Sequence, residues 1–73
     1  MKPGDLVVLN VRAAMALWHD QAVYKTGRSG SLHPTDVSLV LATTKSRNTR
    51  FAALLLTSRG AVGWIAMNVV TVL

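Results

Sequence analysis

The sequence has no cysteine and few acidic or aromatic residues. Without cysteine the chain forms no disulfide and offers no thiolate to a metal, so its composition does not point to an oxidising compartment. Two tryptophans, one tyrosine and one phenylalanine in 73 residues leave the core to aliphatic side chains. We expect residues 1–73 to form a single domain, and a chain this short buries only about 60% of its unfolded surface. Contact with another molecule would add to so small a core.

The sequence also lacks an uninterrupted hydrophobic run long enough to span a membrane. The best candidate, residues 51–73, is divided near its middle by Arg59 and Gly60. An arginine at that depth costs about 2.5 to 3.5 kcal/mol on insertion scales. Near the start, the apolar run Leu6 to Leu9 is too short for the core of a signal peptide. We therefore expect no membrane partner, and a location in the cytoplasm or in a virion assembled there.

Acidic residues are outnumbered, with three against eight basic residues and a formal net charge of +5. This excess favours acidic partners, such as nucleic acid or an acidic protein surface. The cations that could contact phosphates are Lys25 and Arg28 in one polar stretch, and Lys45, Arg47 and Arg50 in another. One hypothesis is therefore a small nucleic-acid-binding barrel that uses the second group as a basic hairpin. Solvated surface charge and contact with a protein are the alternative roles of these cations.

Short β-favouring runs separated by turn signals recur along the chain and predict an all-β fold. The predicted strands are Leu6 to Asn10, Val37 to Thr43, Arg50 to Thr57, Ala61 to Ala66 and Val69 to Val72. The segment between the first two strands is expected to be an extended arm that ends near Trp18, followed by a flexible loop over His19 to His33. A loop of this length in so small a domain is usually functional.

The third predicted strand is apolar on both of its faces. Phe51, Ala53 and Leu55 alternate with Ala52, Leu54 and Leu56, so neither face is polar. Two interpretations follow. Either the strand is central and covered on both sides, or one of its faces is a contact surface for another chain.

The closing stretch Gly63 to Val70 resembles the end of an SH3 domain, where glycine, an aromatic, an aliphatic, proline, any residue, asparagine, tyrosine and valine occur in that order. With five strands and a long loop after the first, the chain resembles a five-stranded SH3-like barrel. The opening Gly4-Asp5-Leu6-Val7 is similar to the start of short SH3-like proteins in tailed-phage and bacterial genomes. The resemblance implies a non-enzymatic module that contacts itself or a larger protein, as in a phage-type virion or assembly subunit.

Two departures from the SH3 pattern affect the expected partner. Ala66 stands in place of the proline and Val69 in place of the tyrosine that help form the groove for proline-rich peptides, so we do not expect such a peptide as ligand. The candidate protein-contact residues are Trp18, Trp64, Ala66 and Val69. Packing at the barrel edge and stacking on a nucleic-acid base are the other roles open to Trp64.

Few residues have the spacing of a catalytic or metal site. Ser31, His33 and Asp36 lie close in sequence, but no nucleophile elbow accompanies them, so we expect Asp36 to accept local backbone hydrogen bonds in a turn. His19, Asp20 and His33 match no usual spacing of metal ligands. We therefore expect no enzymatic activity, no metal and no cofactor.

Overall fold

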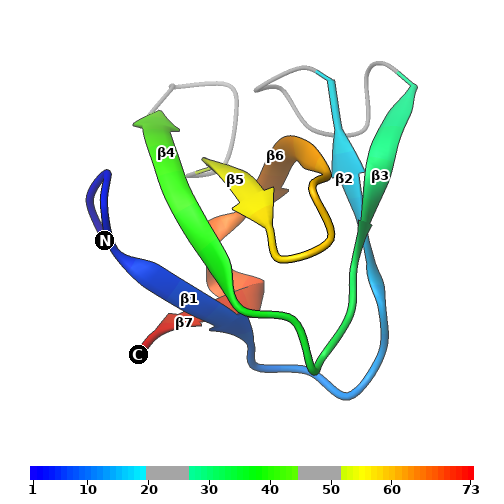
Figure 1. The fold of residues 1–73 in the computed structure, drawn as a ribbon, viewed down its shortest axis with the longest axis horizontal. Coiled ribbons are helices and arrows are strands. Elements are labelled where there is room, and N and C mark those ends of the chain that lie inside the picture. Colours follow the sequence, from blue (N-terminus) through cyan, green and yellow to red (C-terminus); the bar gives the residue numbers. More distant parts are fainter. Residues whose placement is uncertain (20–26, 45–51) are drawn as a thin grey trace.

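The structure is a computed structural model that describes residues 1–19, 27–44 and 52–73. Over these residues the chain is all-β, as predicted (Figure 1). Its elements are the strands β1 (Leu6–Leu9), β2 (Met15–Trp18), β3 (Arg28–Leu32), β4 (Ser38–Thr44), β5 (Ala52–Thr57) and β6 (Val62–Ala66), the 3-10 turn η1 (Met67–Val69), and the strand β7 (Val70–Val72). No helix in the described ranges is long and apolar enough to cross a membrane.

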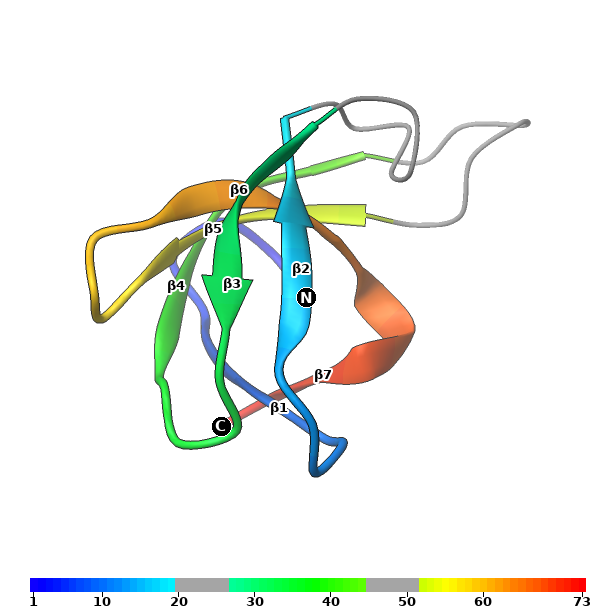
Figure 2. The same ribbon diagram turned by 90° about the vertical axis from the view of Figure 1, so that its right-hand side faces the viewer.

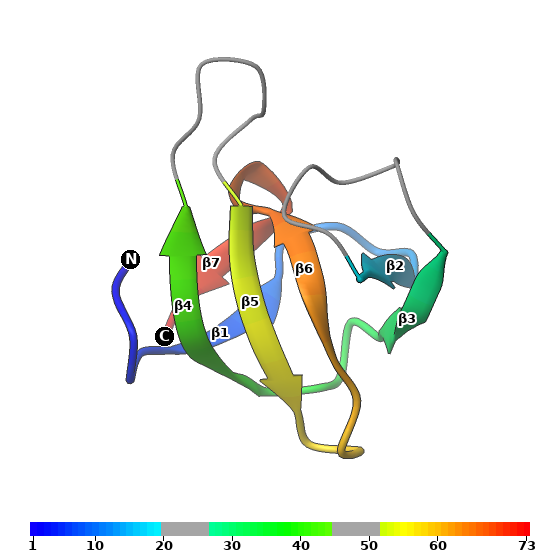
Figure 3. The same ribbon diagram turned by 90° about the horizontal axis from the view of Figure 1, so that it is seen from above.

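The seven strands form one antiparallel sheet in the order β3-β2-β6-β5-β4-β1-β7. β4, β5 and β6 lie side by side, and the strands β1 and β7, which follow β4 in the strand order, pass behind them in this view because the sheet curves (Figure 3). At the opposite edge of the sheet, next to β6, the strands β2 and β3 form a hairpin that crosses β6 at a steep angle (Figure 2). The sheet is strongly curved, and in the described part of the chain its two end strands, β3 and β7, do not pair with each other.

The sheet has two strands more than the sequence predicted. β2 ends at Trp18, where the extended arm was expected to end. β3 lies inside the segment predicted as a flexible loop, so that prediction is wrong for Arg28–Leu32. Its sequence, Arg-Ser-Gly-Ser-Leu, has little β propensity, and the strand depends on pairing with β2 rather than on its own residues.

Gly63 lets the β2–β3 hairpin approach β6 closely. A Cβ atom at this position would lie 2.6 Å from Leu17 Cβ and 3.2 Å from the backbone nitrogen of Trp18, and it would also meet Ser29 Oγ. Only glycine fits where two backbones approach so closely. The hairpin is therefore held by a tertiary contact that no local sequence pattern shows.

The core lies on the concave side of the curved sheet and is aliphatic, as the composition predicted. Its buried members are Val7, Leu9, Leu17, Leu32, Val40, Ala53, Leu55, Ile65 and Val70. They come from all seven strands, so the hairpin and the last strand both contribute to one cluster. Burying a side chain of this kind stabilises the fold by about 1.5 to 3 kcal/mol.

Candidate protein-contact surface

The outer, convex face of the sheet is made by the side chains that alternate with the core residues. On β5, Ala53 and Leu55 are fully buried, whereas Leu54 and Leu56 are only half-buried. Successive side chains of a strand lie on opposite faces, so both leucines belong to the outer face. The structure confirms that β5 is central, between β4 and β6, and its second apolar face is only partly covered.

Four aliphatic residues form a row across the outer face, which we name the aliphatic row. The strand register pairs Leu6 with Leu39, Leu39 with Leu56, and Leu56 with Val62. Residues that face each other on neighbouring strands have Cβ atoms about 4.5 to 5.5 Å apart, so these side chains are neighbours. Leu6 is 48% exposed and Val62 43% exposed, and the two between them are half-buried. The row is therefore accessible at both ends.

A second row, which we name the tryptophan row, runs beside the first. Its members are Ala42, Leu54, Trp64 and Trp18, each the register partner of the next. Leu54 and Trp64 stand two residues from Leu56 and Val62 on the same strands, so the two rows adjoin. Both tryptophans of the chain thus lie on adjacent strands of one surface, and both are half-buried.

The two rows carry no charge along their length. All eight side chains are apolar, and the first charged register partner is Arg28, which faces Trp18 at the edge strand β3. The rows cross four strands each, and strands are spaced about 4.8 Å apart, so the surface extends about 14 Å across the sheet. Contiguous apolar surface on a small protein marks a site of contact with another molecule more often than single exposed apolar residues do.

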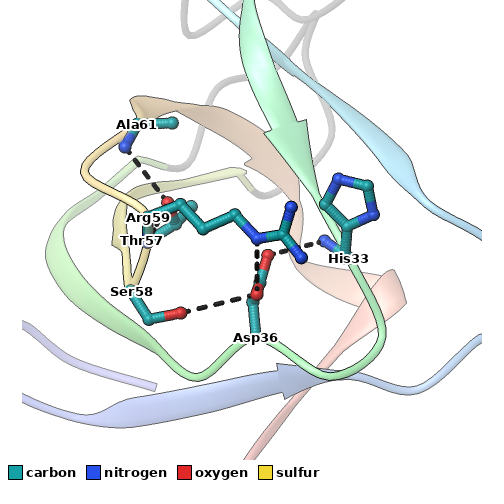
Figure 4. Close-up of polar contacts among 6 residues, drawn as sticks. All are labelled: His33, Asp36, Thr57, Ser58, Arg59 and Ala61. Atoms are coloured by element: carbon teal, nitrogen blue, oxygen red, sulfur yellow. Dashed lines mark hydrogen bonds and ion pairs between the residues drawn. The ribbon is translucent and has the colours of Figure 1, made fainter.

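A polar network fixes the turns at one end of the sheet (Figure 4). Asp36 lies between β3 and β4, and its carboxylate accepts hydrogen bonds from the His33 backbone N–H at 3.1 Å and from Arg59 Nε at 3.2 Å. Ser58 Oγ donates to the same carboxylate at 3.5 Å. Thr57 Oγ1 accepts from the backbone N–H groups of Arg59 and Ala61, at 3.3 and 3.1 Å. The network ties the β3–β4 connection to the β5–β6 turn.

The environment of Asp36 lowers its pKa. Burial of the carboxyl raises the pKa, since the side chain is only 6% exposed, but the hydrogen bond from the His33 backbone and the charge and hydrogen bond of Arg59 outweigh this effect. Arg59 is 61% exposed, so the ion pair has one buried and one solvated member. The carboxylate is thus held ionised as a structural acceptor.

The network has the geometry of a turn and not of a catalytic triad. Asp36 binds the backbone of His33 instead of its imidazole, which confirms the predicted local hydrogen bond. Ser31 Oγ, the hydroxyl of this group of three residues, accepts a hydrogen bond from Arg28 Nη2 at 2.9 Å. Within the described ranges, no three metal-ligating side chains converge.

The structure brings together some of the predicted contact residues and separates others. Trp18 and Trp64 are register partners, although they are 46 positions apart in the sequence. Ala66 is only 6% exposed and offers little surface to a partner. Val69, in η1, packs against the core. Of the predicted phosphate contacts, Arg28 is described, and Lys25, Lys45, Arg47 and Arg50 lie outside the described residues.

Sequence reasoning missed three members of the aliphatic row: Leu6, Leu39 and Val62. Each belongs to a run that was predicted as a strand, so the strands themselves were visible. The sequence does not show the register in which the strands pair. The register decides the face of each side chain, because a shift of one residue moves every side chain of a strand to the opposite face. No local alternation assigns the face of Leu39, because its two neighbours, the polar Ser38 and the apolar Val40, are both buried.

No protein-family description matches the chain, and neither a curated protein nor a solved structure is significantly similar to it. Function is therefore inferred from the outer face of the sheet.

Proposed function

We propose that the chain is a non-enzymatic protein-contact module with a small SH3-like barrel fold, and that it serves as an interaction subunit of a phage-type particle or similar assembly. The order of elements supports the fold: a hairpin follows β1, a tight turn joins β5 to β6, and a 3-10 turn precedes β7. Gly60 takes φ of 86° in that tight turn, a conformation that favours glycine.

The observation that carries the proposed function is the uncharged outer face formed by the aliphatic and tryptophan rows. The chain has eleven charged residues, yet none of them lies in these two rows, whose eight described side chains are all apolar. Exposed leucine and valine side chains cost solubility unless a partner covers them. Two adjacent tryptophans add a large apolar area of the type that anchors protein interfaces.

Charge insertion at both ends of the aliphatic row tests this function. We expect Leu6→Glu and Val62→Glu to leave the fold intact, because both positions are exposed, and to abolish recovery of the chain in complexes from cells of its source organism. Sedimentation of the tagged chain in extracts measures the complex size. The matched control is Ala13→Glu, an exposed position in the segment between β1 and β2. If Leu6→Glu, Val62→Glu and Ala13→Glu all sediment in complexes of the same size, the outer face is not the contact surface.

One observation favours nucleic acid as a second candidate partner. Arg28 faces Trp18 across β3 and β2, so a cation adjoins the aromatic pair. Proteins that bind single strands combine phosphate-binding cations with aromatic side chains on which bases stack. This candidate predicts binding to a generic single strand that weakens with added salt and is lost when Lys45, Arg47 and Arg50 are all replaced by alanine. Absence of binding at low salt would eliminate it.

A further inference from the structure

Both described aspartates accept hydrogen bonds within the chain. Asp36 is paired with Arg59, and Asp5 Oδ2 accepts a hydrogen bond from the Lys2 backbone N–H at 3.0 Å. With three acidic and eight basic residues in the sequence, the uncompensated charge of the surface is positive. Long-range attraction therefore favours a partner with a net negative charge.

Arg28 places part of this positive charge at the end of the tryptophan row. It is exposed and is the register partner of Trp18. Its Nη2 donates to Ser31 Oγ at 2.9 Å, which orients the guanidinium group along β3. No carboxylate of the described residues lies within ion-pair distance of it. A guanidinium group has five N–H donors, so Arg28 has donors left for an acidic group of another molecule.

We propose that the outer face binds an acidic amphipathic segment of a partner protein, whose apolar side chains cover the two rows and whose carboxylates meet Arg28. This inference rests on the proposed function and narrows it to the chemistry of the partner. The centre of the surface supplies apolar area without charge, and its end supplies the cation. A segment with an apolar stripe bordered by glutamate or aspartate complements both features.

A second copy of the chain fits this surface less well. Each copy carries a net charge of +5, so two copies repel each other. Opposite Arg28 a copy would have to present a carboxylate, and neither described aspartate belongs to the two rows: Asp36 is paired with Arg59, and Asp5 accepts a hydrogen bond from the Lys2 backbone. The acidic partner meets neither difficulty.

Two synthetic helical peptides provide the test. Both have leucine at positions i, i+3, i+4 and i+7, and the remaining positions are mainly glutamate in one peptide and lysine in the other. About 14 residues give a helix of about 21 Å, enough to cross the surface. Both tryptophans of the chain lie in the tryptophan row, so selectively excited tryptophan emission reports binding at this surface.

We expect the glutamate peptide to bind about tenfold more tightly than the lysine peptide, or better, at low salt, and the difference to shrink as salt screens the charges. Arg28→Gln should weaken binding of the glutamate peptide about two- to fivefold. Arg12→Gln removes the same charge at an exposed position outside both rows and should leave the affinity close to that of the unmodified chain.

Three results would overturn the inference. Equal affinity for the two peptides would refute the acidic partner while leaving an apolar contact surface, and with it the proposed function, in place. An equal effect of Arg28→Gln and Arg12→Gln would show that only net charge matters. Concentration-dependent dimers that Val62→Glu dissociates, without binding of either peptide, would assign the face to a second copy.

Discussion

Two buried hydroxyl groups on neighbouring strands differ in their hydrogen bonds. Ser38 on β4 and Thr57 on β5 are register partners, and both are buried. Thr57 Oγ1 accepts two backbone hydrogen bonds from the β5–β6 turn. Among the described residues, Ser38 Oγ has no hydrogen-bond partner, although it is buried. An unsatisfied buried hydroxyl destabilises a fold, whereas a satisfied one is costly to remove.

Substitutions at these two positions should therefore change stability in opposite directions. Ser38→Ala should raise the free energy of unfolding by about 1 kcal/mol, because it removes an unpaired polar atom. Thr57→Val should lower it by about 1 to 3 kcal/mol, because the backbone N–H groups of Arg59 and Ala61 lose their acceptor. Urea unfolding measures both values. A loss of stability in Ser38→Ala as large as that in Thr57→Val would contradict this account.

Asp36 should make the stability of the protein depend on pH in the acidic range. Its pKa is lower in the folded chain than in the unfolded chain, so its contribution is fully present above the ordinary carboxyl value. The contribution is lost as the pH falls from that value through the lower pKa of the folded state. Asp36→Asn should remove this part of the pH dependence and lower stability at neutral pH.

Urea unfolding at a series of pH values from neutral to acidic measures the effect of Asp36. Arg59→Gln is the matched variant: it removes the ion pair but keeps the hydrogen bond from the His33 backbone, so it should lessen the pH dependence without abolishing it. Parallel stability curves for the unmodified chain and Asp36→Asn would show that the carboxylate contributes nothing to the acid sensitivity.

At the residue scale the sequence predicted local chemistry better than distant contacts. The turn at Asp36 was predictable, because proline two positions before it and the short range of an aspartate side chain favour a local hydrogen bond. The ion pair to Arg59 was not, since it joins two turns that lie 23 positions apart. The pairing of Trp18 with Trp64 depends in the same way on tertiary structure.

At the scale of elements, the hairpin of β2 and β3 depends on Gly63 of β6. Gly63→Ala should destabilise the fold by about 1 to 3 kcal/mol or more, because the new methyl group overlaps Leu17 and Ser29. Gly27→Ala is the control, since among the described residues the atom nearest to the new methyl group would be His19 Cδ2, at 4.0 Å. Thermal unfolding of both variants measures the difference. Equal melting temperatures would indicate that the hairpin does not pack against β6 as described.

β3, one of the two strands that were not predicted, differs from the predicted strands in the source of its stability. β1, β4, β5 and β6 are rich in valine, leucine and other apolar residues, and a local pattern is enough to find them. β3 contains two serines and a glycine, and it forms because Leu32 enters the core and β2 supplies its hydrogen bonds. The sequence therefore predicted an all-β chain but not the number of its strands.

At the scale of the whole molecule, two properties of the composition act on different parts of the surface. The excess of basic residues keeps the surface charged, while the two apolar rows remain uncharged over the described positions. That β5 had a second apolar face was visible in its sequence. That this face joins Leu6, Val62 and both tryptophans required the register of five strands.

The most direct test of the contact surface is site-specific photo-crosslinking in cells of the source organism. A photoreactive amino acid at Val62 lies at the exposed end of the aliphatic row, and the same group at Ala13 lies outside both rows. We predict that illumination joins the Val62 chain to one protein species of defined mass, and that the Ala13 chain gives no such product. Equal products from both positions, or a product from Ala13 alone, would contradict the assignment of the outer face as the contact surface.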